Sequence, residues 1–437
     1  MTGRRRSTLP RPSTTLRFRT ACTAVAATGA SLLAGCGVLP GDPGGSREPV
    51  TVMTFAPEDT QATNMPGMPA MAKAYARWAA ARGGIDGHEL RVITCNEQNR
   101  PQGAASCARR AVKEGAVAVV GSYSQHGDAF MAPLEAAGIP FIGGYGISEA
   151  EFSSYLSYPV NGGQAALLAG NGEQLADACE KVSLVRPDSL AGDDLPALLN
   201  AGLARGKNQE SADILAEEDA TDYTEQALLA RKRAAQPTWT TTMAGGDRPG
   251  CVTAALGDRT ETFFDSFRRL PDDGRQVRIS SVMGSVGQPL VDRTGGRNGP
   301  YEGAYITGWY PDAGDTRWGP MRDVINDHAF GDNSVDPADA GVQTTWIAYT
   351  VLDKVIRSLD TDRVTSGKIS HALDQGVEVS TGNLTPPLRW GYEDMLGASG
   401  YPRIVNSSVT FQVVRGGRLT EQRKDFVDVG RTLMDAS

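Results

Sequence analysis

Short apolar runs alternate with longer amphipathic segments along most of the chain. Residues 116–120 form an uninterrupted apolar run, which is typical of a strand buried on both faces of a parallel sheet. Residues 66–82 instead place alanine, methionine and aromatic side chains on one helical face. The predicted strands span residues 50–55, 89–94, 116–120, 139–142, 182–185, 212–215, 251–256, 277–282, 301–309, 409–414 and 418–423. The predicted helices span residues 66–82, 101–114, 128–137, 164–179, 194–204, 223–234, 259–270, 317–328 and 340–359.

This alternation predicts repeated β-α-β units. The expected fold class is α/β, with mainly parallel sheets and right-handed connections between consecutive strands. One exception lies near the C-terminus, where Gly416 and Gly417 separate two predicted strands. A two-glycine turn between strands predicts an antiparallel hairpin at that point.

The N-terminal segment has the features of an export signal. Six arginines and no acidic residue precede a short apolar region at residues 21–34, which is too short to span a membrane. The sequence Leu33-Ala34-Gly35-Cys36 then reads as a lipobox, in which cleavage makes Cys36 the lipidated N-terminus. Several acyl chains, palmitate among them, would anchor the protein stably at the outer face of the cell membrane. An ordinary secretory signal peptide cleaved nearby is the alternative.

The net charge of the chain limits the classes of partner that it can bind. The chain has 43 Lys and Arg against 51 Asp and Glu, and removal of the six signal arginines leaves 37 against 51, a net charge of about −14. Such a surface argues against nucleic acid and against anionic lipid, so we expect membrane contact through the lipid anchor only. The Gly- and Pro-rich residues 36–49 predict a flexible tether. The expected state is a monomer.

Four cysteines remain beyond the signal and the lipidation residue. An even number in an oxidising compartment suggests two disulfides. Sequence proximity favours Cys95–Cys107 and Cys179–Cys251, with the other pairings and four buried thiols as alternatives. The spacing contains no Cys-x-x-Cys pair, so we expect no metal site, and no cofactor is expected.

The candidate ligand site follows from the predicted parallel sheets. Ligands of open parallel sheets bind beyond the carboxyl ends of the strands. Residues 121–127 and 143–148 would lie there, and they combine glycine for close backbone approach with hydroxyl and tyrosine side chains. Ordinary strand-to-helix turns are the alternative interpretation. The candidate ligand-binding residues are Asp59, Thr60, Gln61, Ser122, Tyr123, Ser124, Gln125, Tyr145, Gly146, Ser148, Ser189, Asp258 and Ser285.

Several motifs in order resemble one known family. Residues 83–90, Gly-Gly-Ile-Asp-Gly-His-Glu-Leu, and residues 95–99, Cys-Asn-Glu-Gln-Asn, are similar to a signature of type 1 periplasmic binding proteins. Residues 119–124 and 137–143 continue the match. The resemblance is to the branched-chain amino acid binding family of ABC transporters, and it extends from about residue 50 to residue 424.

The resemblance implies two Rossmann-like lobes joined by three hinge crossovers, ligand capture by hinge closure, and no catalysis. The corresponding division is a signal peptide at 1–35, a tether at 36–49, lobe 1 at 50–160 and 309–405, and lobe 2 at 161–308 and 406–437.

The family's binding residues carry over only in part. Residues 122–125 would hold a ligand carboxylate, and residues 146–148 would supply the next contact. Val286 stands where an acidic residue that grips an ammonium group is expected, unless Asp258 replaces it. The sequence therefore favours a carboxylate, amide or hydroxylated ligand over leucine.

Three functions compete. The first is a solute-binding lipoprotein that delivers a small polar, amino-acid-like or carboxylate ligand to an ABC permease. The second is a receptor lipoprotein that signals to a membrane sensor. The third, a secreted hydrolase, lacks support, because the chain has neither a Gly-x-Ser-x-Gly nor a His-Glu-x-x-His motif. We therefore expect no enzyme activity.

Overall fold

The computed structural model describes most of the chain after the predicted tether. The described residues are 47–60, 63–189, 192–217, 220–235, 248–271, 274 and 277–436. The predicted signal peptide, the lipidation residue Cys36 and the candidate ligand residue Gln61 lie outside them. Within the described ranges, no helix is both long enough and apolar enough to cross a bilayer.

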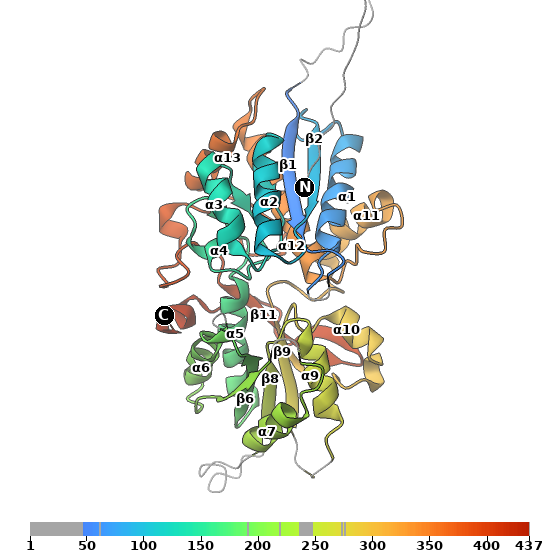
Figure 1. Ribbon diagram of the computed structural model, residues 1–437, viewed down its shortest axis with the longest axis vertical. Coiled ribbons are helices and arrows are strands. Elements are labelled where there is room, and N and C mark those ends of the chain that lie inside the picture. The colour runs from blue at the N-terminus through green and yellow to red at the C-terminus, as the bar shows by residue number, and fades with distance from the viewer. Residues whose placement is uncertain are drawn as a thin grey trace, which may run out of the picture. The chain divides into compact units, whose positions relative to one another are not determined.

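The first sheet has five strands, all paired in parallel, in the order β2-β1-β3-β4-β5. Alternate side chains face opposite layers: Val52 packs with the cluster that includes α1 and α12, and Phe55 packs with α2 and α3. The strands are β1 (Val50–Ala56), β2 (Leu90–Asn96), β3 (Ala118–Val120), β4 (Phe141–Ile142) and β5 (Ser157–Tyr158). The helices are α1 (Gly67–Ala81), α2 (Pro101–Lys113), α3 (Gly127–Ala137), α4 (Ala150–Ser153), α11 (Gly319–His328), α12 (Ala340–Leu359) and α13 (Ser366–Asp374) (Figure 1).

The second sheet has eight strands in the described chain, with the path β12-β11-β10-β9-β8-β6-β7, and β13 pairs with β11. Pairs from β7 through β10 are parallel, and β11 pairs antiparallel with all its neighbours. The strands are β6 (Val182–Pro187), β7 (Ala212–Ala216), β8 (Gly250–Ala254), β9 (Val277–Val282), β10 (Tyr305–Gly308), β11 (Ser408–Arg415), β12 (Arg418–Glu421) and β13 (Val427–Asp428). The helices are α5 (Gly163–Ala178), α6 (Leu195–Arg205), α7 (Thr224–Ala234), α9 (Arg259–Arg268), α10 (Gln288–Arg293) and α14 (Gly430–Ala436).

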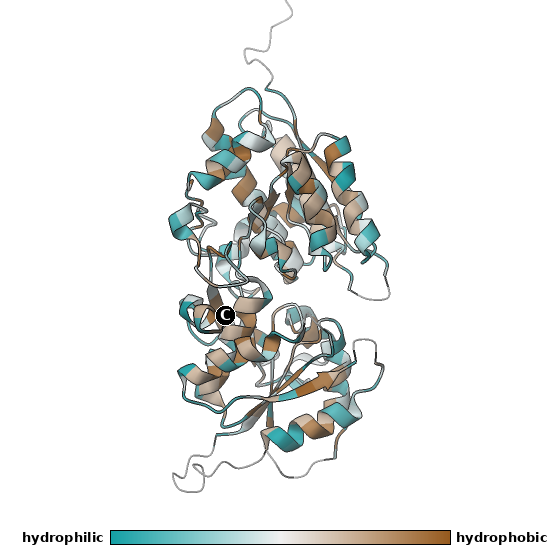
Figure 2. Cartoon of the chain, turned by 60° about the vertical axis from the view of Figure 1, so that its left-hand side comes forward, coloured by the Kyte–Doolittle hydropathy of each residue, from teal (hydrophilic) through white to brown (hydrophobic). Residues whose placement is uncertain are grey.

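The two sheets form two lobes, as the family resemblance implied. The chain passes between the sheets three times: after β5, after β10 and before β11. Hydrophobic residues gather along the strands and on the helix faces turned toward them, and polar residues lie on the outer faces (Figure 2). The predicted two-lobe α/β architecture with three crossovers is therefore confirmed.

Several elements differ from their predicted bounds: β3 and β4 each begin two residues later than predicted, and β12 ends two residues earlier. The strand expected at 301–309 is only Tyr305–Gly308, because Gly303 adopts a left-handed backbone conformation (φ +80°) that breaks the extended run. The helix expected at 317–328 is split into a 3₁₀ turn, Thr316–Trp318, and α11. The predicted hairpin is present: Gly416 and Gly417 join β11 to β12.

Both predicted disulfides are present. Cys95 of β2 bonds to Cys107 of α2, and Cys179 at the end of α5 bonds to Cys251 of β8. Val182 of β6 pairs with Cys251 in the parallel sheet, which places Cys179 and Cys251 together at the amino-terminal edge of neighbouring strands. The second disulfide therefore lies opposite the sheet edge at which ligands bind.

Candidate functional site

The second candidate loop, residues 143–148, follows β4 and is shaped by one carboxylate. Glu151 on α4 accepts hydrogen bonds of 3.0 Å from the backbone N–H groups of Gly146, Ile147 and Ser148, and a fourth of 3.0 Å from the Ser148 hydroxyl. The Glu151 side chain is buried. Burial raises its pKa, while these hydrogen bonds act in the opposite direction. Glu151 therefore holds the backbone of the loop that carries Tyr145.

The first candidate loop, residues 121–127, is held in a similar way. The Ser124 hydroxyl donates to Glu97 Oε2 at 3.1 Å and accepts from the His126 backbone N–H at 3.1 Å. Ser122 Oγ accepts from the Phe55 backbone N–H at 3.0 Å, across the sheet. Burial raises the pKa of Glu97, against the effect of the Ser124 hydrogen bond. Both serine hydroxyls therefore have partners within the protein.

A cleft of about 290 Å³ lies beside these loops. Its walls come from the segment 283–290 at the carboxyl end of β9, the start of α12, and Tyr145 of the second loop. Met65 and Leu419 add apolar surface. The cleft is thus lined from both lobes, at the carboxyl ends of strands, where a ligand of this fold class is expected.

Two buried side-chain oxygens on this wall have no hydrogen-bond partner among the residues that the structure describes. They are Tyr145 Oη and Gln343 Oε1, on side chains that are 4% and 1% exposed. Buried polar atoms are almost always satisfied, and an unpaired one costs about 1–3 kcal/mol. Gly284 lies against the Tyr145 hydroxyl, where an added Cβ would be 2.5 Å from Oη. These two oxygens are therefore the candidate contacts of a bound molecule.

Carboxylates dominate the charge of the cleft. Asp258, Asp312 and Asp339 line it, and burial raises the pKa of each. Arg293 also lines it, but its guanidinium lies 2.6 Å from a carboxylate oxygen of Glu261. The lining therefore carries an excess of negative charge over positive charge.

Comparison with known proteins identifies the family. Residues 60–389 match the sequence profile described as periplasmic binding protein. The chain belongs to the periplasmic binding protein family. No curated protein gave a match.

Solved structures share the fold. A substrate-binding periplasmic protein from Ralstonia solanacearum has 15% identity and a TM-score of 0.67 over 85% of this chain and 100% of its own. A possible leucine/isoleucine/valine-binding protein from Rhodopirellula baltica has 15% identity and a TM-score of 0.67, with coverage of 87% and 98%. An ABC transporter solute-binding protein from R. palustris, solved with 4-hydroxybenzoate, has 12% identity and a TM-score of 0.66, with coverage of 87% and 97%. The expected resemblance to type 1 periplasmic binding proteins is confirmed.

The structure brings together three of the predicted site residues of this periplasmic binding protein. Tyr145, Asp258 and Ser285 all line the cleft. Tyr123 does not line the cleft, but its ring packs edge-on against Tyr145 at 5.2 Å between centroids. Gly146 contributes its backbone N–H to Glu151 rather than to the cleft.

The other predicted residues lie off the cleft lining. Ser122, Ser124 and Ser148 are buried with the protein partners given above, so their ligand-binding roles stay predictions. Ser189 has a buried hydroxyl with no partner among the described residues, and it does not line the cleft. The remaining predicted residues lie in loops at this edge: Asp59 and Thr60 after β1, and Gln125, whose amide donates to Tyr123 Oη at 3.1 Å.

Sequence reasoning missed the residues that start α12 and the two glutamates that shape the loops. Asp339 caps α12 by accepting from the Val342 backbone N–H at 2.9 Å, and Gln343 follows one turn later. In the sequence both look like ordinary positions at the start of an amphipathic helix. Glu97 and Glu151 carried a usable signal, because each lies three residues after the end of a predicted strand or candidate loop.

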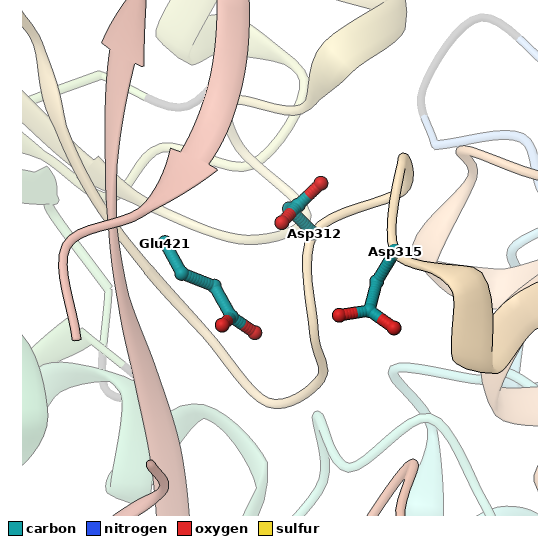
Figure 3. Close-up of side chains that lie close together, drawn as sticks. All are labelled: Asp312, Asp315 and Glu421. Carbon is teal, nitrogen blue, oxygen red and sulfur yellow. The ribbon is translucent and has the colours of Figure 1, made fainter. Parts of the chain in front are cut away.

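An acidic group, Asp312, Asp315 and Glu421, lies near the second crossover, and Asp312 also lines the cleft (Figure 3). Arg317 already occupies the position that a cation would take: its Nη2 lies 2.8 Å from Asp315 Oδ2 and 3.0 Å from Glu421 Oε1. Arg317 also lowers the pKa of Asp315. We interpret Arg317, Asp315 and Glu421 as an ion-pair network that ties the crossover to β12, with Asp312 beside it.

The buried carboxylates predict how the stability of this periplasmic binding protein depends on pH. Because burial raises the pKa of Glu97 and Glu151 above the ordinary 4.5, the folded state binds more protons than the unfolded state between 4.5 and the raised values. The free energy of unfolding therefore rises as the pH falls through that window. Carboxylates of lowered pKa, such as Asp315, reverse the trend at more acidic pH.

We expect urea unfolding to give a higher free energy at about pH 5 than at about pH 7. Glu151→Gln, which cannot titrate, should reduce this difference. A steady fall in the free energy from pH 7 to pH 5 would contradict the prediction.

Proposed function

We propose that the protein is an extracytoplasmic solute-binding lipoprotein that captures a small polar organic molecule between its lobes by hinge closure and delivers it to an ABC permease. The observation that carries the proposal is the cleft at the carboxyl ends of the strands, with the unpaired oxygens of Tyr145 and Gln343 on its wall. Solute-binding proteins of ABC transporters from R. palustris share the fold and were solved with benzoate and with 4-hydroxybenzoate.

The lining of the cleft supports binding over catalysis. Ser285 lines it, but the described lining includes no histidine or cysteine that would activate a nucleophile. Carboxylates and apolar side chains make up much of the rest. We propose that lobe 1 comprises 50–160 and 309–405, lobe 2 comprises 161–308 and 406–437, and residues 36–49 tether the lobes to the membrane.

The direct test of the proposal is a binding titration of the full-length protein. The panel is leucine, 4-hydroxybenzoate, benzoate, pentanoate and agmatine, followed by calorimetry and by recovery of the bound compound. The proposal predicts one-to-one saturable binding of a compound that is recovered unchanged. Conversion of the compound to a product would refute it. Loss of cellular uptake on deletion of the protein would distinguish transport from sensing.

The lipid anchor gives a separate prediction. Cys36→Ala is expected to move the protein from the membrane fraction to the soluble fraction, because the residue that would carry the acyl chains is gone. Cys22→Ala, inside the predicted signal, is the matched control and should stay with the membrane. Quantitative immunoblotting of the two fractions is the measurement. Membrane retention of Cys36→Ala equal to that of the control would contradict the anchor.

A further inference from the structure

We propose that the ligand is a small organic cation that carries N–H donors, such as a primary ammonium or a guanidinium, and that it docks at the start of α12. The inference rests on the proposed function, since it names the ligand class of the same cleft. It departs from the sequence-based expectation of a carboxylate ligand. Three independent features of the cleft carry it: an unpaired amide oxygen, an unpaired phenol and an excess of carboxylates.

The amide of Gln343 has a defined orientation. Its Nε2 lies 3.0 Å from the carbonyl oxygen of Pro337, and a carbonyl can only accept, so the nitrogen must face it. The oxygen Oε1 therefore lies on the other side, buried and without a donor. Because Oε1 can only accept, the group that completes it must be an N–H or O–H donor.

The phenol of Tyr145 is held in place beside this acceptor wall. Its ring packs edge-on against Trp309 at 5.2 Å and against Tyr123 at 5.2 Å. The hydroxyl is buried, lines the cleft and has no partner. A phenol oxygen can accept from the same donor-bearing group, and its rigid position means that little side-chain entropy is lost on binding.

The charges on the lining disfavour an anionic ligand. Asp258, Asp312 and Asp339 form no salt bridge within the described part of the chain. The arginine of the lining, Arg293, is neutralised by Glu261 at 2.6 Å. Closure of the lobes would remove water, and a ligand carboxylate would then face these carboxylates without a counter-ion. A cation would gain from the same desolvation.

The apolar part of the cleft fits a short alkyl chain. Met65, Met283, Leu290, Ile306 and Leu419 lie on its lining. The volume of about 290 Å³ is at the lower end of small-molecule sites. A compact amine or guanidine with an alkyl body therefore matches the charge, the donor requirement and the size together.

Calorimetric titration of the full-length protein tests this inference. The probes are agmatine, which carries an ammonium and a guanidinium on a short chain, its fully N-methylated ammonium analogue, and pentanoate. We expect agmatine to bind at least about tenfold more tightly than pentanoate. The methylated analogue, which keeps the charge but loses the ammonium donors, should bind about tenfold more weakly than agmatine.

Two variants test whether Gln343 contributes to agmatine binding. Gln343→Met removes the acceptor at similar size and should weaken agmatine binding about ten- to a hundredfold. Gln102→Met, on the exposed face of α2, is the matched control and should leave binding unchanged. Circular dichroism and urea unfolding would show that both variants are folded.

The outcomes separate this inference from the proposed function. Saturable pentanoate or 4-hydroxybenzoate binding without agmatine binding would overturn the cation inference and leave solute binding intact. Agmatine binding that is unchanged by Gln343→Met would also overturn it. Absence of binding by every compound of the panel, together with no small molecule detected by mass spectrometry of the purified protein, would count against both.

Discussion

Replacement of Glu151 by alanine is expected to lower the free energy of unfolding by about 3–5 kcal/mol. Glu151 is 2% exposed and accepts hydrogen bonds from three backbone N–H groups and from the Ser148 hydroxyl. Alanine would leave these buried donors without an acceptor, at about 1–3 kcal/mol each before relaxation. Water entering the vacated space would recover part of that cost.

The measurement is urea unfolding followed by circular dichroism. Glu149→Ala is the control, because Glu149 is exposed and its side chain does not cap α4. The control should change the free energy by less than about 0.5 kcal/mol. If Glu151→Ala lies within that range as well, the carboxylate does not organise the loop that carries Tyr145.

The second large effect is expected from the disulfide between the end of α5 and β8. Replacing Cys179 and Cys251 by serine should lower the free energy of unfolding by about 4 kcal/mol, because the bond closes a long loop in the unfolded chain. Their separation is 72 residues, whereas Cys95 and Cys107 are 12 residues apart. Removing the Cys95–Cys107 bond, which closes the shorter loop, should lower the free energy of unfolding by about 3 kcal/mol.

Urea unfolding of the two double-serine variants under non-reducing conditions shows which disulfide contributes more to the free energy of unfolding. Ligand binding should survive in the Cys179/Cys251 variant, because that bond lies at the sheet edge opposite the cleft. A greater loss of stability in the Cys95/Cys107 variant would contradict the loop-closure argument.

Much of the fold was predictable because it is encoded locally. The apolar run that forms β3, the amphipathic segment that forms α1 and the Gly416-Gly417 turn each specify their structure within a few residues. The strand end near Gly303 and the break at Trp318 depended on backbone conformations that hydrophobic patterns do not encode.

The candidate site was less predictable, because its side chains have competing partners from distant segments. Ser122 and Ser124 follow a strand at the expected edge, yet Phe55 and Glu97 satisfy their hydroxyls. Gln343, in contrast, lies about 200 residues away in sequence from the loop of Tyr145, and only the second crossing between the sheets, after β10, brings α12 and Gln343 to the cleft. Sequence spacing alone held no signal for that pairing.

Small-angle X-ray scattering during a ligand titration tests the central claim, capture of a small molecule by closure of the two lobes. The account predicts that the radius of gyration falls as the binding compound of the panel saturates the protein, and that Gln343→Met shifts this fall to higher concentration. Saturable binding with no change in the radius of gyration would contradict capture by hinge closure.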